Sequence, residues 1–176
     1  MILRKKSSQK LKSLYEKAFP ANERKPFSLI EKNAENGVMD ILSLEENGDF
    51  LGLVITALDR DIVLIDYFAV DESKRNGGIG GRALRLIAER YRGRRIFLEI
   101  ESPDEKSENN AQRISRKAFY LRNGLKESGI LADVYETNME LLVFDRPVTF
   151  SEYLNLYKKA MGEEQLKKTG QPKQKL

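Results

Sequence analysis

A glycine-rich segment is the part of this chain whose residue types and spacing most clearly could do chemistry. Four glycines fall within residues 77–81, after an apolar run over residues 62–70 and before a helical pattern. Glycine permits a positive φ and lets an anion approach the main chain closely. A helix that begins near Gly80 would direct its unpaired N–H groups and the positive end of its dipole to the same place. We expect this segment to bind a phosphate or pyrophosphate.

Two sequence patterns share this chemistry. Residues 78–83 match the dinucleotide pattern G-x-G-x-x-A, and Glu99 or Glu101 follows about 20 residues later, where a ribose-binding acid would lie. In that pattern the first glycine follows the first strand almost immediately, whereas here residues 71–77 intervene and apparent structure precedes the motif. A second pattern is Arg or Gln, two residues, Gly, one residue, then Gly or Ala. Arg75-x-x-Gly78-x-Gly80 fits it at the correct distance from the strand.

The residue types that are missing exclude several kinds of site. The chain of 176 residues has no His, Cys or Trp. Ser-His-Asp and Cys-His catalysis, and zinc sites built on His or Cys, are therefore excluded. Acid–base chemistry must fall to Asp, Glu, Tyr or Lys. No spacing of carboxylates indicates a metal site, so we expect no metal.

Composition indicates an ordinary globular protein, with 40% apolar and 33% charged residues. No apolar run approaches the roughly 18 residues that a membrane helix requires. Residues 1–6 lack a secretory pattern, and the absence of cysteine is compatible with a reducing compartment. These observations predict a cytoplasmic protein with no membrane association.

Positive charge is concentrated at the two ends. The net charge is +4, and residues 1–17 carry six Lys or Arg against one Glu, while residues 163–176 carry four Lys against two Glu. Basic ends can bind nucleic acid, but more often they only improve solubility. We expect no nucleic-acid partner, and a nucleic-acid-binding module stays an alternative.

The order of the elements predicts one domain over residues 1–162 and a basic, disordered tail over residues 163–176. Two short helices, over residues 8–19 and 26–32, precede three strands over residues 38–44, 50–58 and 62–70. Asn47-Gly48 is a hairpin signal between the first two of these strands. Next come a helix over residues 80–91 and a strand over 95–101. They are followed by a helix over 111–122 and two strands over 125–130 and 135–144. The expected core residues of the helix over 111–122 are Ile114, Ala118, Phe119 and Leu121. Thr149 and Glu152 form a capping box that opens a helix to Met161.

The central unit is therefore a strand, the glycine loop, a helix and a strand, which requires a parallel crossover. An antiparallel meander precedes this crossover and further strands follow it. The predicted fold class is a mixed-sheet α/β fold.

This order, the glycine loop and one further segment together resemble the GNAT superfamily of N-acetyltransferases, of bacterial type. The further segment, residues 118–125, is similar to the end of the family's fourth helix, where a tyrosine is followed four residues later by glycine: here Tyr120 and Gly124. Residues 98–100 (Leu-Glu-Ile) resemble the family's fifth strand, and residues 19–26 its acceptor-side helix pair. The resemblance covers roughly residues 1–160 and implies the acyl-CoA N-acyltransferase fold.

The resemblance implies acetyl-CoA as co-substrate and a direct attack by a primary amine on the thioester. Main-chain groups at the end of the strand would pair with the pantetheine arm, and the glycine loop would hold the pyrophosphate. The cofactor-binding residues expected on this basis are Phe68, Ala69, Val70, Arg75, Asn76, Gly77, Gly78, Ile79, Gly80 and Gly81. Glu99 is the candidate general base, with Glu101 second, and Tyr120 is the candidate general acid that protonates the leaving thiolate. Asp66, Asp133, Tyr135 and Glu140 are further polar residues for the acceptor pocket.

Two departures from the family pattern affect these roles. Many members have an Asn seven residues before the tyrosine, and this chain has Arg113 there; residues 102–110 also lengthen the connection after Glu99. A non-catalytic acyl-CoA-binding or regulatory domain of the same fold and a nicotinamide-dependent oxidoreductase are the alternatives. The acceptor amine, small molecule or peptide, and the choice between monomer and homodimer stay open.

Overall fold

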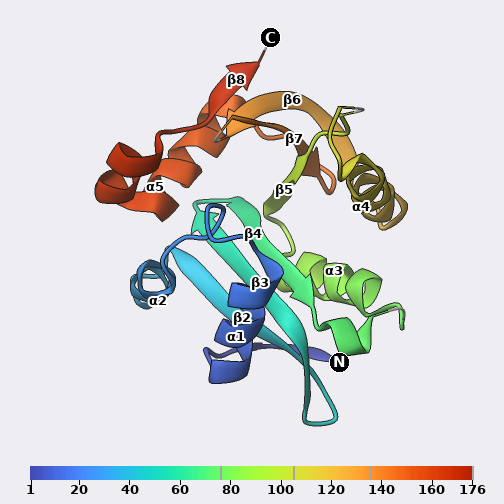
Figure 1. Cartoon of the computed structure of the whole chain (residues 1–176). Coiled ribbons are helices and arrows are strands. Elements are labelled where there is room, and N and C mark those ends of the chain that lie inside the picture. Colours follow the sequence, from blue (N-terminus) through green and yellow to red (C-terminus); the bar gives the residue numbers. More distant parts are fainter. Residues whose placement is uncertain (76, 105, 135, 176) are drawn as a thin grey trace. The chain divides into compact units, whose positions relative to one another are not determined.

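A computed structural model of the chain describes residues 1–75, 77–104, 106–134 and 136–175. Within these residues, eight strands form one mixed sheet in the order β1-β2-β3-β4-β5-β7-β6-β8, accompanied by five α-helices (Figure 1). The predicted α/β class and the order of meander, crossover and final strands are confirmed. The chain divides into an N-terminal unit, Met1–Arg60 with Ile65–Gly93, and a C-terminal unit, Asp61–Leu64 with Arg94–Leu176.

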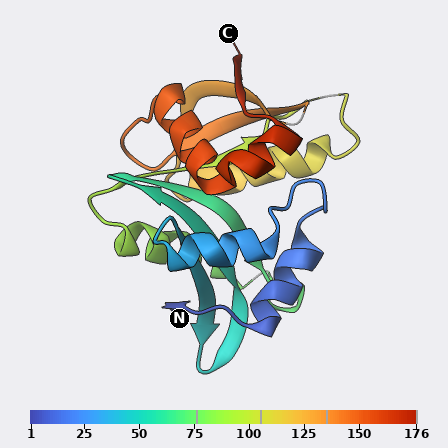
Figure 2. The same cartoon turned by 90° about the vertical axis from the view of Figure 1, so that its left-hand side faces the viewer.

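The N-terminal unit is an antiparallel meander with helices on both faces. Its elements are β1 (Ile2–Lys5), α1 (Gln9–Ala18), α2 (Phe27–Glu35), β2 (Met39–Glu46), β3 (Asp49–Asp59), most of β4 (Ile62–Val70), the 3₁₀ helix η1 (Glu72–Lys74) and α3 (Ile79–Arg90). Strands β1, β2 and β3 pair antiparallel in sequence order. Helices α1 and α2 cover one face and α3 the other (Figures 1 and 2).

The predicted hairpin of this unit is confirmed. Asn47 and Gly48 adopt φ values of 52° and 87°, the left-handed conformations that a tight two-residue turn requires. The turn sets the register of β2 against β3, and side chains on both faces of the pair are buried, among them Leu42, Leu44 and Leu53. Burial of these side chains supplies the main driving force for folding of the meander.

The C-terminal unit is a second antiparallel group with one helix on each face (Figures 1 and 2). Its elements are the start of β4, β5 (Arg95–Glu101), α4 (Asn110–Arg122), β6 (Lys126–Val134), β7 (Thr137–Val143), α5 (Phe150–Thr169) and β8 (Lys173–Lys175). β7 lies between β5 and β6, and β8 pairs with the outer edge of β6. On the α5 side, the ring of Phe97 contacts that of Tyr153, with centroids 6.1 Å apart.

Helix α5 begins as predicted and ends later than predicted. Thr149 and Glu152 form the expected capping box. Gly162 takes a φ of 72° and kinks the helix, but helical residues continue to Thr169, and Lys173–Lys175 pairs with Leu131–Asp133 as β8. The structure thus differs from the expected disordered tail over residues 163–176. The reason is that a positive-φ glycine can bend a helix as well as end it, and that edge strand β6 offers unpaired backbone groups.

The expected core of α4 was wrong. Ile114 and Leu121 are 51% and 39% exposed, Ala118 is also exposed, and Phe119 is half-buried. The buried residue of α4 is Tyr120. Helical periodicity identifies residues that share a face, but it does not say whether the sheet covers that face. Among the described residues, none of the helices has the length and apolarity needed to cross a bilayer.

Candidate functional site

The start of α3 has the geometry of an anion site. Gly78 is the N-cap residue, with φ 69° and ψ 9°, and no side chain caps the first turn. Ile79, Gly80 and Gly81 form that first turn, whose N–H groups have no partner within an α-helix. A left-handed residue without a Cβ lets these groups converge, so the positive end of the helix dipole is open to an anionic ligand.

The loop that leads to α3 is held by side chains. Asp71 caps η1 by accepting the Ser73 N–H at 2.9 Å, and Lys17 of α1 contacts Glu72 at 2.7 Å. The Nε of Arg75 donates to the carbonyl oxygen of Val70 at 3.3 Å. Arg75 therefore ties the loop back to the end of β4. Asn76, another predicted cofactor-binding residue, lies outside the described residues, and Gly77 is exposed.

The end of β4 lies immediately before this loop. Phe68 and Val70 are half-buried and Ala69 is buried, so the three residues predicted to contact the pantetheine arm alternate along the strand. A Cβ on Gly52 of β3 would lie 2.3 Å from the carbonyl oxygen of Ala69. Gly52 is thus required for the close approach of β3 to the end of β4. The sequence carried a signal for it, because a lone glycine inside a strand often marks such an approach.

In the C-terminal unit, Glu99 lies near the end of β5. It is half-buried and pairs in register with Leu141 of β7. Side chains alternate along a strand, so Glu99 shares the face of Phe97, which contacts α5 through Tyr153. Ile100 and its register partner Glu140 lie on the opposite face, where Lys117 of α4 contacts Glu140. Tyr120 belongs to α4, the helix whose Lys117 contacts Glu140.

Tyr120 is buried near the end of α4, and burial raises the pKa of its phenol to about 12, against a smaller opposing effect of the positive charge on Arg116. Among the described residues, its hydroxyl has no hydrogen-bond partner. A phenol with this pKa is protonated at neutral pH, so it can donate a proton.

The carboxylate of Glu101, the second candidate base, forms ion pairs with two arginines. One carboxylate oxygen accepts from Arg113 at 2.9 Å and the other from Arg116 at 3.2 Å. Arg113 also donates to the Oδ1 of Asn109 at 2.8 Å and to the carbonyl oxygen of Ser102 at 3.1 Å. Arg113 thus secures the long connection between β5 and α4. Sequence reasoning singled out Arg113 as a departure but did not foresee this network, because its members meet only after α4 docks on β5.

The other predicted polar residues are engaged elsewhere. The Nζ of Lys25 donates to both oxygens of Asp66, at 2.9 and 2.8 Å; Lys25 is buried and the Asp66 side chain is only 10% exposed. Glu140 accepts from Lys117 at 2.8 Å, and its buried Oε1 has no partner among the described residues. Asp133 accepts the backbone N–H of Glu136 in a turn, and Tyr135 lies outside the described residues. None of these contacts indicates an acceptor pocket.

The matching family model agrees with this geometry. Residues 8–115 match the model of the acetyltransferase (GNAT) family, and the chain belongs to this family. No curated protein matches the chain in sequence.

Solved structures share the fold. A putative GNAT-family acetyltransferase from Bacteroides thetaiotaomicron is 19% identical, with a TM-score of 0.74 over 97% of this chain and 99% of that one. An acetyltransferase from Bacillus subtilis in complex with CoA is 16% identical, with a TM-score of 0.63 over 82% and 96%. An aminoglycoside 6'-N-acetyltransferase from Enterococcus faecium is 15% identical, with a TM-score of 0.59 over 84% and 100%. At these identities the likeness concerns the fold alone.

Proposed function

We propose that the protein transfers the acetyl group of acetyl-CoA to a primary amine, which attacks the thioester directly. In this proposal residues 1–162 form one acetyltransferase domain. The protein works in the cytoplasm as a monomer or homodimer. The observation that carries this proposal is the uncapped start of α3 at Gly78, directly after β4 and its tethered loop. Membership of the GNAT family and the CoA complex of the B. subtilis relative support the same donor.

In this scheme the N-terminal unit holds the donor. Backbone N–H groups of residues 77–81 bind the pyrophosphate, and those of Phe68, Ala69 and Val70 pair with the amides of the pantetheine arm. Asn76 belongs to the same loop in sequence. Arg75 keeps the loop tied to β4 through Val70. Since this binding uses mainly the backbone, substitutions that change backbone geometry are expected to weaken it more than changes of side-chain charge.

The C-terminal unit supplies the proton transfers. An alkylammonium acceptor must lose a proton before its nitrogen can attack, and Glu99 accepts that proton directly or through water. Tyr120 donates a proton to the sulfur as the C–S bond breaks. Each transfer is worth about 10²–10⁴-fold in rate.

The acceptor is a small-molecule or peptide amine. The E. faecium relative acts, by its name, on an aminoglycoside, which is an amine-bearing small molecule. A carboxylate at Glu99 would also attract a cationic acceptor. No metal ion takes part in the scheme.

A transfer assay with a panel of amines tests this proposal. Purified protein is mixed with acetyl-CoA and polyamines, amino acids, aminoglycosides or peptides, and both CoA release and amide formation are measured. We expect one amine class to give stoichiometric amide, and Glu99→Gln to lower kcat about 10²-fold or more. Glu108→Gln, which changes an exposed glutamate, is the control and should keep wild-type kcat. Tight acetyl-CoA binding with no amide from any acceptor, and no effect of Glu99→Gln on binding, would favour the non-catalytic alternative.

A further inference from the structure

Strand β8 covers part of the outer edge of β6. Residues Leu131–Asp133 of β6 pair antiparallel with β7 on one side and with Lys173–Lys175 on the other. β8 is therefore the last strand of the sheet, and it takes the edge position that β6 would otherwise hold. An edge strand offers its backbone N–H and C=O groups to any other strand, so this cover decides what β6 can bind.

β6 lacks the features by which proteins usually protect a free edge. Residues 128–132 read Ser-Gly-Ile-Leu-Ala, without a charge or a proline, and Leu131 is 43% exposed. Short apolar segments of this kind pair readily with a copy of themselves. The strand at the other end of the sheet order, β1, carries Arg4 and Lys5, whose charges protect its edge. β6 depends on β8 for this protection.

The covered part of β6 follows a bulge. The register between β6 and β7 shifts across residues 127–131. There the hydroxyl of Ser128 donates to the carbonyl oxygen of Leu141 at 2.8 Å and accepts the N–H of Ile130 at 3.0 Å. A bulge bends an edge strand and interrupts its pairing, so the regular segment that could accept another strand is Leu131–Val134.

The cover itself is a small element. All three residues of β8 are exposed, Pro172 before them is buried, and Lys175 contacts Asn138 of β7. Helix α5 ends at Thr169, and Gly170 follows with a φ of 80°, so the chain changes direction there before it reaches β6. We expect so short and exposed a strand to detach before the strands beneath it unfold.

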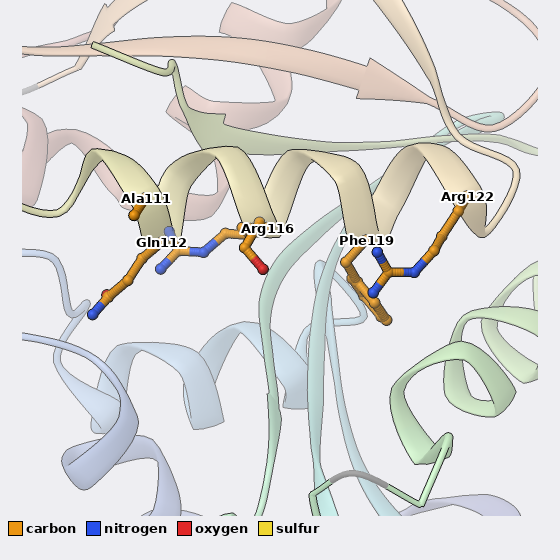
Figure 3. A pocket seen from close by; sticks show the side chains of 6 residues that line it. Ala111, Gln112, Arg116, Phe119 and Arg122 are labelled. Atoms are coloured by element: carbon orange, nitrogen blue, oxygen red, sulfur yellow. The ribbon is translucent and has the colours of Figure 1, made fainter. Parts of the chain in front are cut away.

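A second surface of this unit, a shallow depression over α4, fits another copy of the chain less well. It has a volume of about 540 Å³ and is lined by Ala111, Gln112, Ser115, Arg116, Phe119 and Arg122 (Figure 3). If two copies met through this same surface, the guanidinium groups of Arg116 and Arg122 would face those of the other copy. Like charges that face each other disfavour association.

We propose that β8 is a displaceable cover over a self-association site, and that β6 of one copy pairs antiparallel with β6 of a second copy when β8 detaches. A two-fold axis at Ala132 places Leu131 of each copy opposite Asp133 of the other, so no like charges face each other there. The pairing uses the edge of β6 in both copies and therefore stops at a dimer. With β8 in place, the chain is a monomer. This inference does not depend on acetyl transfer.

The test removes the cover by substitution in the full chain. Lys173→Pro with Gln174→Pro removes two successive backbone N–H groups, and at least one of them faces β6 because these groups alternate along a strand. Lys173→Thr with Gln174→Thr makes the same change of charge but keeps the N–H groups and favours a strand, so it is the matched control. Light scattering measures the molar mass of each protein over a range of concentrations. Urea unfolding checks that each variant is folded.

Wild type and the threonine control should have the mass of one chain, 20.2 kDa for wild type. The proline variant should double its mass as its concentration rises. In the proline variant, Leu131→Glu should restore the monomer, because the new carboxylate would lie opposite Asp133 of the second copy. Leu131→Lys should keep the dimer, because its charge is opposite to that of Asp133.

Several results would overturn the inference. One is a folded proline variant that stays monomeric, and another is a wild type or threonine control that dimerises to the same extent. Equal effects of Leu131→Glu and Leu131→Lys would contradict the pairing centred at Ala132, and assemblies larger than a dimer would contradict its closed symmetry. If the proline variant does not fold, Lys173→Gly with Gln174→Gly weakens β8 without removing N–H groups and takes its place with the same expectations.

Discussion

Tyr91 in the N-terminal unit and Tyr120 in the C-terminal unit are both buried tyrosines, and burial raises the pKa of each phenol to about 12. Their hydroxyl groups differ. That of Tyr91 donates to Asp40 at 2.9 Å and lies 2.8 Å from the hydroxyl of Thr56. That of Tyr120 has no hydrogen-bond partner among the described residues. Equal pKa values thus accompany two different environments.

The comparison separates a structural phenol from one that is available for chemistry. A satisfied buried hydroxyl contributes to stability, and its removal leaves its partners unpaired. A hydroxyl without a partner contributes little to stability and is free to meet a ligand. The hydrogen-bond environment, more than the pKa, therefore distinguishes the two tyrosines.

The largest expected effect comes from removing the hydroxyl group of each tyrosine in turn. Tyr120→Phe should lower kcat about 10²-fold or more because the thiolate loses its proton donor, while stability and CoA affinity change little. Tyr91→Phe should lower the free energy of unfolding by about 1–3 kcal/mol, because Asp40 and Thr56 lose a buried partner, and kcat should remain near wild type. Steady-state kinetics and urea unfolding of both variants measure these values. Equal kcat losses in the two variants would remove the distinction.

The ion pair of Lys25 with Asp66 in the N-terminal unit is a second contact with a structural role. Lys25→Met should cost about 3–5 kcal/mol of unfolding free energy, because Asp66 would keep a buried charge without its partner. The double variant Lys25→Met with Asp66→Asn should recover much of that loss, since the uncompensated charge is gone. Urea denaturation of the two variants checks this. A double variant no more stable than Lys25→Met would show that packing of Lys25, and not its charge, is what matters.

The next effect concerns the binding of acetyl-CoA by backbone N–H groups of the glycine loop. Gly78→Ala and Gly93→Ala place a Cβ at φ values of 69° and 86°, in both cases with no other atom within 4 Å. Each should cost about 1–2 kcal/mol of stability through backbone strain. Gly78→Ala alone should raise KM for acetyl-CoA, about tenfold, because only Gly78 opens the start of α3. A similar rise in KM for Gly93→Ala would attribute the effect to general loosening of the unit.

The smallest expected effect concerns Glu152, a structural carboxylate whose pKa is lowered in the folded protein. Hydrogen bonds from Arg95, and then from the backbone of Thr149, lower the pKa of Glu152 to about 2. A lowered pKa in the folded state gives stability that is present above the unfolded value, near pH 4.3, and lost as pH falls toward 2. Because Glu152 is partly exposed, this loss should be about 1 kcal/mol or less. Unfolding followed from pH 6 to pH 2 should show it in wild type but not in Glu152→Gln.

Much of the fold could be predicted from the sequence because its signals are local. The bounds of β4 and β5 agree with the apolar runs at residues 62–70 and 95–101. The Asn47-Gly48 hairpin and the Thr149 capping box follow from the chemistry of a few neighbouring residues. The glycine loop could also be predicted from a few neighbouring residues, since a left-handed glycine and a helix start are both local features.

The parts that could not be predicted depend on which elements meet. The contacts of Arg113 and Arg116 with Glu101 join residues from a strand and a helix, and neither residue pattern alone specifies them. The exposure of Ile114 and Leu121 depends on how far the sheet extends under α4. The roles of Glu99 and Tyr120 rest on a family resemblance and stay predictions, because a side chain's chemistry depends on its surroundings.

The central claim, that the glycine loop binds acetyl-CoA, is tested most directly by thermal unfolding with acetyl-CoA, CoA and NADH at equal concentrations. A ligand that binds only the folded state adds about 2.7 kcal/mol of stability at a hundredfold excess over its Kd. Acetyl-CoA and CoA should raise the Tm of wild type, NADH should not, and the shift should be smaller for Gly78→Ala than for Gly93→Ala. A shift with NADH alone, or none with acetyl-CoA, would contradict the account.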